Sequence, residues 1–114
     1  MKFTIVIKDA PYGKERAFSA LRFALTALLE GTDVNIFLLE DGIFVAKRGQ
    51  NPLNVPNYLE LLENVIEAGA VVKACGPCGK ARGILEEDLV SGVKFGTMND
   101  LTAFVRESDR NITF

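Results

Sequence analysis

Three short apolar runs limit the folds that are open to this chain. They cover residues 3–7 (FTIVI), 34–39 (VNIFLL) and 70–74 (AVVKA). Nearly continuous runs of this kind are typical of strands that are covered on both faces in a parallel sheet. Because parallel strands need long crossover connections, we expect helices between consecutive runs.

The segments between these runs have the apolar period of helices. Residues at helical spacing form one stripe between the first two runs: Phe18, Leu21, Leu25 and Leu28. Gly31 ends this predicted helix, and residues 57–68 repeat the pattern before the third run.

A further helix is expected to begin at Thr97, because its spacing to Asp100 is that of a capping box. Its predicted buried stripe consists of Leu101, Phe104 and Val105.

Two short strands are expected around this last helix, at residues 92–95 and 110–114. Strands and helices then alternate along the chain, which is the pattern of an α/β protein. We therefore expect residues 1–114 to form a single domain of the flavodoxin-like or Rossmann-like class. Its architecture would be a three-layer α/β/α sandwich with a mostly parallel sheet of about five strands.

The segment DGIFVAKRGQNPLNVP, residues 41–56, has the Gly and Pro content of a loop but many apolar residues. An exposed loop of this composition would be an adhesive patch on the surface. It either folds back on its own domain or forms a subunit interface, and the sequence leaves both alternatives open.

Composition restricts the partners and the chemistry. The net charge of −2 argues against a nucleic-acid partner. No apolar run approaches the roughly 20 residues that span a bilayer, and the start lacks a signal-peptide cleavage site, so we expect a cytoplasmic protein without a membrane partner. The chain contains no histidine, which excludes Ser-His-Asp and Cys-His catalysis within one chain.

Both cysteines, Cys75 and Cys78, lie directly after the third apolar run, in ACGPCGKARG. Chemistry in an open α/β sheet gathers beyond the carboxyl ends of the strands. Free amide groups at the start of a following helix stabilise an anion, and Lys80 and Arg82 add positive potential. We therefore expect the pKa of Cys75 to fall. The alternative is that both cysteines are small buried residues of the core.

Three other interpretations of the CGPC motif fail on its surroundings. A thioredoxin needs a later cis-proline, and no proline follows the motif. One C-x-x-C supplies two of the four ligands of a structural zinc site, so we expect no metal. Ala74 and Ala81 replace the first glycine and the hydroxyl residue of a phosphate loop. A reactive cysteine that needs no cofactor remains.

Several segments together carry a family resemblance: APYG at 10–13, RGQNP at 48–52, C-x-x-C-x-x-x-R-G-I at 75–84, GVKFGT at 92–97 and DRNITF at 109–114. Through them the chain resembles the YchN-like branch of the DsrE/DsrF (TusD-type) sulfur-relay family over nearly its whole length. The resemblance implies a DsrE-type fold and a sulfurtransferase role, in which Cys75 accepts persulfide sulfur from a donor protein and passes it to an acceptor protein.

The resemblance also implies roles for neighbouring residues. Arg82 and Gly83 match the RG of the family, and we expect Arg82 to stabilise the thiolate. Tyr12 and Gly13 match the first loop of the family, which we expect beside the reactive cysteine. Relay members lack a second cysteine, so we expect Cys78 to be the secondary residue.

Members of the family form homo-oligomers, commonly trimers or hexamers, and we expect the same here. The alternative function is a non-catalytic oligomeric module that binds a small anion or a partner protein and has redox-sensitive cysteines.

Overall fold

The expected alternation of strands and helices is present in the computed structural model of the chain, which describes residues 1–114. The elements follow in this order: β1 Lys2–Ile7, α1 Arg16–Leu29, β2 Asp33–Leu38, the 3₁₀ helix η1 Glu40–Ala46, α2 Tyr58–Glu67, β3 Val71–Cys75, α3 Gly76–Ala81, the 3₁₀ helix η2 Glu86–Asp88, β4 Val93–Gly96, α4 Met98–Glu107 and β5 Arg110–Thr113. None of the helices combines the length and the hydropathy needed to cross a membrane.

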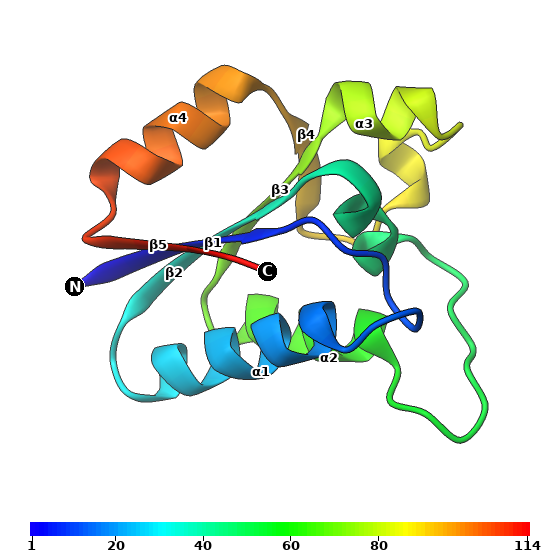
Figure 1. The fold of residues 1–114 in the computed structure, drawn as a ribbon, viewed down its shortest axis with the longest axis horizontal. Coiled ribbons are helices and arrows are strands. Elements are labelled where there is room, and N and C mark those ends of the chain that lie inside the picture. The colour runs from blue at the N-terminus through cyan, green and yellow to red at the C-terminus, as the bar shows by residue number, and fades with distance from the viewer.

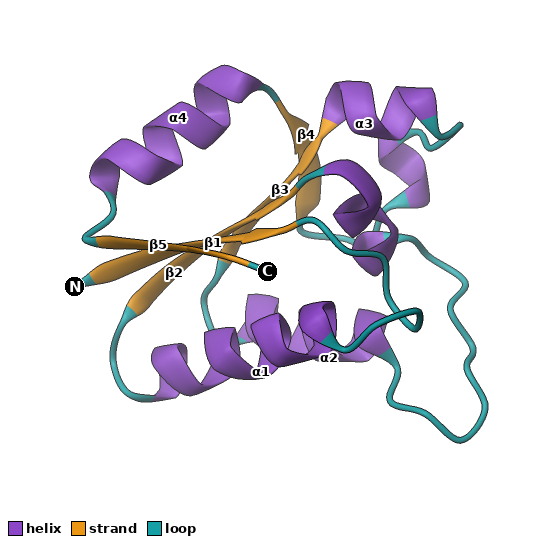
Figure 2. Cartoon of the chain, viewed as in Figure 1, coloured by secondary structure: helices purple, strands orange, loops and turns teal.

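The five strands form one sheet in the order β4-β3-β2-β1-β5, and every neighbouring pair is parallel. In β1, Ile5 lies opposite Ile36 of β2 and Ile112 of β5. Helices α1 and α2 cover one face of this sheet and α4 covers the other (Figure 1 and Figure 2). The predicted α/β sandwich is confirmed, with a sheet that is entirely parallel.

The core is divided between the two faces of the sheet. A cluster of 23 buried residues includes the inward sides of α1 and α2. A second cluster contains only Phe37, Cys75 and Phe104, with Leu39, Cys78 and Leu101 packed against it. Because Phe104 belongs to α4, both cysteines lie in or beside the small apolar cluster beneath that helix.

The inward side of α1 differs from the predicted stripe. Of the four predicted residues only Leu21 is buried, while Phe18, Leu25 and Leu28 are partly buried at its margin. The remaining buried positions are all alanines: Ala17, Ala20, Ala24 and Ala27. Small side chains let the helix approach the sheet closely, and a search for large apolar residues passes over them.

The first of the two alternatives for segment 41–56, folding back on its own domain, holds for one part of the segment. Its first part is η1, in which Ile43 and Val45 are fully buried, so this part folds back on its own domain. Its second part leaves Leu53 and Val55 with exposed fractions of 83% and 53%. The free apolar surface of the segment is therefore confined to residues 53–55.

Helix α4 begins as predicted. The Thr97 hydroxyl accepts the Asp100 amide at 3.3 Å, and the Asp100 carboxylate accepts the Thr97 amide at 2.8 Å. Phe104 faces the sheet as expected, but Val105 is 39% exposed and lies outside the buried stripe.

Candidate functional site

Cys75 lies at the carboxyl end of β3, where the sequence places it. It is the last residue of the strand and the N-cap of α3. Its backbone is extended, and its Sγ accepts the amide of Cys78 at 3.3 Å. The first amide groups of a helix have no partner within the helix, and here one of them, the amide of Cys78, donates to the sulfur of Cys75.

Helix α3 is short and tightly packed because of its glycines. A Cβ atom at Gly79 would lie 2.8 Å from Cδ1 of Ile43 in η1 and 2.9 Å from Cζ of Phe95 in β4. Pro77 is tolerated in the first turn, where its missing amide has no helical partner. The local sequence therefore holds the cysteine-bearing helix against η1.

Gly83 ends this helix. Its φ is +71°, its amide donates to the carbonyl of Lys80 at 3.2 Å, and the amide of Ile84 donates to the carbonyl of Gly79 at 2.8 Å. This pair of bonds is a Schellman motif, which requires the left-handed conformation that glycine adopts readily. Gly83 thus has a structural role beside the site: it terminates α3 directly after Arg82.

Cys78 has a hydrogen-bond donor from a different element. The amide of Glu40 points at Cys78 Sγ across 3.2 Å. Glu40 has a φ of +54°, a conformation that costs a residue with a side chain of order 1–3 kcal/mol and recurs at functional sites. Cys78 is partly exposed, whereas Cys75 is only 6% exposed, so Cys78 is the more accessible thiol.

The helix η1 brings Glu40 to this place. A Cβ atom at Gly42 would overlap the carbonyl oxygen of Ile7 and lie 2.7 Å from its carbonyl carbon. The start of η1 is therefore pressed against the end of β1 and crosses the carboxyl edge of the sheet. The sequence carries no signal for Glu40, because its role depends on backbone geometry rather than on residue type.

Arg82 lies beside the cysteines but is occupied. Its Nε donates to the Asp41 carboxylate at 2.8 Å, and its Nη1 donates to the carbonyl of Cys78 at 3.1 Å. The hydrogen bond with Asp41 raises the pKa of Arg82. The guanidinium therefore joins η1 to α3, and its charge is largely compensated by Asp41.

The expectation that the pKa of Cys75 falls is wrong. Burial raises the pKa of the Cys75 thiol, and the neighbouring Cys78 thiol raises it as well. The amide of Cys78 lowers it, and the weakest influence is the charge of Arg82, which also lowers it. Desolvation of the anion outweighs the donors at the helix start, because the cluster beneath α4 encloses the sulfur.

Tyr12 forms its hydrogen bonds with residues other than the cysteines. Its hydroxyl donates to the side-chain oxygen of Gln50 at 2.6 Å and accepts the amide of Tyr58 at 3.3 Å. None of its hydrogen bonds involves a cysteine. Gly13 lines a hollow that Asp41 also lines, and a Cβ atom added at Gly13 would have no neighbour within 4 Å.

Gln50 links Tyr12 to η1. Its side-chain amide donates to the carbonyls of Phe44, Val45 and Lys47 at distances between 2.9 and 3.2 Å. Tyr12 thus supports η1 through Gln50. The sequence contains this residue in the segment RGQNP, but only the structure shows which carbonyl groups it binds.

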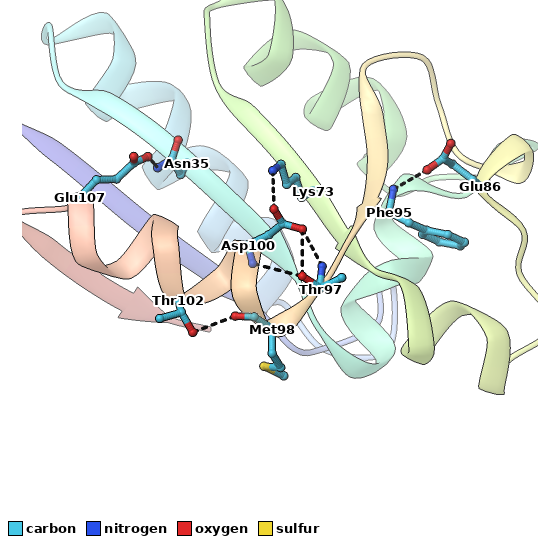
Figure 3. Close-up of polar contacts among 9 residues, drawn as sticks. All are labelled: Asn35, Lys73, Glu86, Phe95, Thr97, Met98, Asp100, Thr102 and Glu107. Carbon is cyan, nitrogen blue, oxygen red and sulfur yellow. Dashed lines mark hydrogen bonds and ion pairs between the residues drawn. The ribbon is translucent and has the colours of Figure 1, made fainter.

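Polar contacts fix α4 to strands β2 and β3 (Figure 3). Lys73 of β3 donates to Asp100 of α4 at 2.9 Å, and Asn35 of β2 donates to Glu107 at 2.7 Å. The Lys73 hydrogen bond lowers the pKa of Asp100, and the Asn35 hydrogen bond lowers the pKa of Glu107. These contacts hold the helix that covers Cys75.

The contents of the site define its chemistry. Both cysteines are free thiols. No three His, Cys, Asp or Glu side chains gather in a group that would hold a metal ion. The arrangement offers two neighbouring thiols, each receiving one backbone amide, at the carboxyl edge of a parallel sheet.

Comparisons with known proteins agree with this fold. The sequence matches the DsrE/DsrF-like family over residues 1–114. An uncharacterized protein of Methanocaldococcus jannaschii is 72% identical over 114 residues, which is 100% of both chains. Protein YchN of Escherichia coli strain K12 is 36% identical over 116 residues, 99% of this chain and 98% of that protein.

A relative with a named activity is more distant. Sulfurtransferase TusD of Cronobacter sakazakii is 28% identical over 94 residues, 77% of this chain and 71% of that protein. Among solved structures, the crystal structure of the E. coli YchN protein superposes with a TM-score of 0.94 at 34% identity, covering 100% of this chain and 99% of that one.

Proposed function

This chain belongs to the DsrE/DsrF-like family, and from that premise we propose that it is a sulfur carrier that accepts persulfide sulfur on Cys75. The observation that carries the proposal is the amide of Cys78, which donates to Cys75 Sγ at 3.3 Å at the end of β3. A donor aimed at Sγ stabilises the thiolate that attacks. The relative named as a sulfurtransferase supports sulfur transfer as the chemistry.

The acceptance step needs no base and no cofactor. The thiolate of Cys75 attacks the terminal sulfur of a donor persulfide, and the sulfur–sulfur bond of the donor breaks as the new bond forms. The donor leaves as a thiolate with the electron pair. In the second transfer, an acceptor thiolate takes the terminal sulfur from Cys75 in the same way.

Burial of Cys75 has two opposite effects on this chemistry. It lowers the fraction of thiolate at neutral pH, because it raises the pKa of the thiol. It also shields a bound persulfide from water and from unrelated thiols, since only 6% of the residue is exposed. A carrier gains from this protection between encounters with its donor and its acceptor.

The proposal includes partners and an assembly. A sulfur donor protein and an acceptor protein are required, and a reducing compartment such as the cytoplasm keeps both thiols free. We assign self-association into a trimer or hexamer to the apolar part of segment 41–56, because Leu53 is 83% exposed and Val55 is 53% exposed.

Intact-mass spectrometry tests the carrier function. The Cys78→Ser variant, which keeps Cys75 as its single thiol, is incubated with a low-molecular-weight persulfide and desalted, and it is expected to gain the mass of one sulfur atom. Cys75→Ser is expected to gain none, with an unchanged circular dichroism spectrum as the control for folding. A Cys78→Ser variant that takes up no sulfur would instead indicate the second candidate, a binding module with redox-sensitive cysteines. The burial of Cys75 favours this candidate.

A further inference from the structure

Cys78 is a thiol for which the carrier function on Cys75 has no use. Its Sγ receives the amide of Glu40 at 3.2 Å, and its own amide donates to Cys75 Sγ at 3.3 Å. It is the more exposed cysteine of the two. A carrier that passes sulfur to another protein uses the Cys78 amide but has no need of the Cys78 thiol, since a second thiol beside a persulfide is a competing acceptor.

The two thiols are close enough to react with each other. Cys78 lies three residues after Cys75 at the start of α3 and is near enough for its thiol to raise the pKa of Cys75. Residues at this spacing have Cβ atoms about 5–6 Å apart on a helix, and a disulfide needs about 3.5–4.5 Å. Cys75 is the N-cap with an extended backbone, and the Cys78 amide lies 3.3 Å from its Sγ, so we infer that rotation of the two side chains brings the sulfurs together.

We propose that Cys78 resolves the persulfide on Cys75, so that the pair acts as a persulfide reductase that releases hydrosulfide. This inference rests on the proposed sulfur loading of Cys75. The thiolate of Cys78 attacks Sγ of Cys75, and the bond between that Sγ and the terminal sulfur breaks. The terminal sulfur leaves with the electron pair and takes a proton from solvent.

The electrons of this step balance within the protein. The sulfane sulfur gains two electrons and becomes hydrosulfide, while the two cysteine sulfurs together lose two electrons and become the Cys75–Cys78 disulfide. An external dithiol then reduces the disulfide and restores the free pair.

The helix η1 prepares Cys78 for this attack. The amide of Glu40 holds Cys78 Sγ in place by a hydrogen bond of 3.2 Å, and the left-handed backbone at Glu40 is maintained although it is strained. Arg82 binds Asp41 of η1 and the carbonyl of Cys78 at once, so it is a positioning residue for the pair. Transfer to an acceptor protein occurs only when the acceptor reaches the persulfide before Cys78 does.

A single-turnover experiment under anaerobic conditions tests the proposal. Wild type, Cys78→Ser and Cys75→Ser are mixed with an equimolar amount of glutathione persulfide, and persulfide, hydrosulfide and free thiols are followed with time. The wild type is expected to release hydrosulfide in an amount equal to the protein and to lose both free thiols. Peptide mass spectrometry is expected to show the Cys75–Cys78 disulfide.

Cys78→Ser is expected to load sulfur and to keep it. Intramolecular attack by an oriented thiol is far faster than attack by a dilute external thiol. The persulfide of this variant is therefore expected to persist at least about 100-fold longer than that of the wild type. Cys75→Ser is expected to show neither loading nor release. Cys78→Ala is the control for the hydroxyl group introduced by serine.

The outcomes separate this proposal from the carrier function. A wild type that loads sulfur and keeps it as long as Cys78→Ser does would overturn the reductase step and leave the carrier standing. Hydrosulfide release without loss of the two thiols would overturn it as well. A wild type that shows neither a persulfide nor hydrosulfide release, together with a Cys78→Ser variant that does not load sulfur, would overturn both. Because the free thiols are counted on the wild type, this part of the test does not depend on whether a variant folds.

Discussion

Substitution of Gly42 by alanine tests whether η1 is built against the end of β1. The added Cβ would overlap the carbonyl oxygen of Ile7 and lie 2.7 Å from its carbon and 3.3 Å from the nitrogen of Lys8. All three are backbone atoms at the end of β1, so no rotation of a side chain relieves the overlap. The start of η1 must move away from the sheet.

The sign of the effect follows from two opposing terms. Replacing glycine by alanine at an unstrained position stabilises a protein by about 0.4–1 kcal/mol through the unfolded chain. Overpacking of a rigid core destabilises it by about 1–3 kcal/mol. Because backbone atoms are overlapped, we expect the steric term to prevail, with a net loss of roughly 1–2 kcal/mol. At about 4–8 °C per kcal/mol this lowers Tm measurably.

Urea unfolding followed by circular dichroism measures this loss, and Gly13→Ala is the matched control. Gly13 has nothing within 4 Å of an added Cβ, so its substitution is expected to leave the free energy of unfolding unchanged or slightly higher. The Gly42 variant is also expected to expose Cys78 to alkylation, because the amide of Glu40 moves with η1. Equal stability of the two variants would refute the close packing of η1.

Further predictions concern thiol reactivity and assembly. In Cys78→Ser, the rate of Cys75 alkylation is expected to reach half of its maximum at a higher pH than it does for free cysteine, because burial raises the pKa of Cys75. A half-maximal pH at or below that of free cysteine would contradict the role of burial. Arg82→Ala removes the contact with Asp41 of η1, so it is expected to speed alkylation of Cys78. The pH dependence of Cys75 alkylation is expected to stay nearly unchanged, because the charge of Arg82 has little influence on the pKa of Cys75. Arg106→Ala, at an exposed position, is the control. Sedimentation is expected to show an oligomer that Leu53→Asp weakens; a stable 12.5 kDa species at micromolar concentration would exclude it.

The parts of the fold that depend on local sequence were predictable. The strands follow from continuous apolar runs, and the start of α4 follows from the spacing of Thr97 and Asp100, which form their capping box within one turn. The position of Cys75 at the end of β3 follows from the run that precedes it. Each of these features is decided by residues that are neighbours in the chain.

The parts of the site that depend on distant segments were not predictable. The pKa of Cys75 is set by burial under α4, and the contact between Lys73 and Asp100 that holds this helix joins residues 27 positions apart. Arg82 pairs with Asp41, which is 41 positions away. A count of nearby positive charges therefore gave the wrong direction for the pKa, since it omits both desolvation and the carboxylate that compensates the arginine.

The position of the incoming sulfur is the measurement that tests the account most directly. Wild type is exposed briefly to a persulfide donor, quenched with an alkylating reagent, digested, and analysed by peptide mass spectrometry for the cysteine that carries the added sulfur. The account predicts that the earliest time points show sulfur on Cys75 alone, followed by the Cys75–Cys78 disulfide. Sulfur that appears first on Cys78, with loading retained in Cys75→Ser and lost in Cys78→Ser, would contradict it.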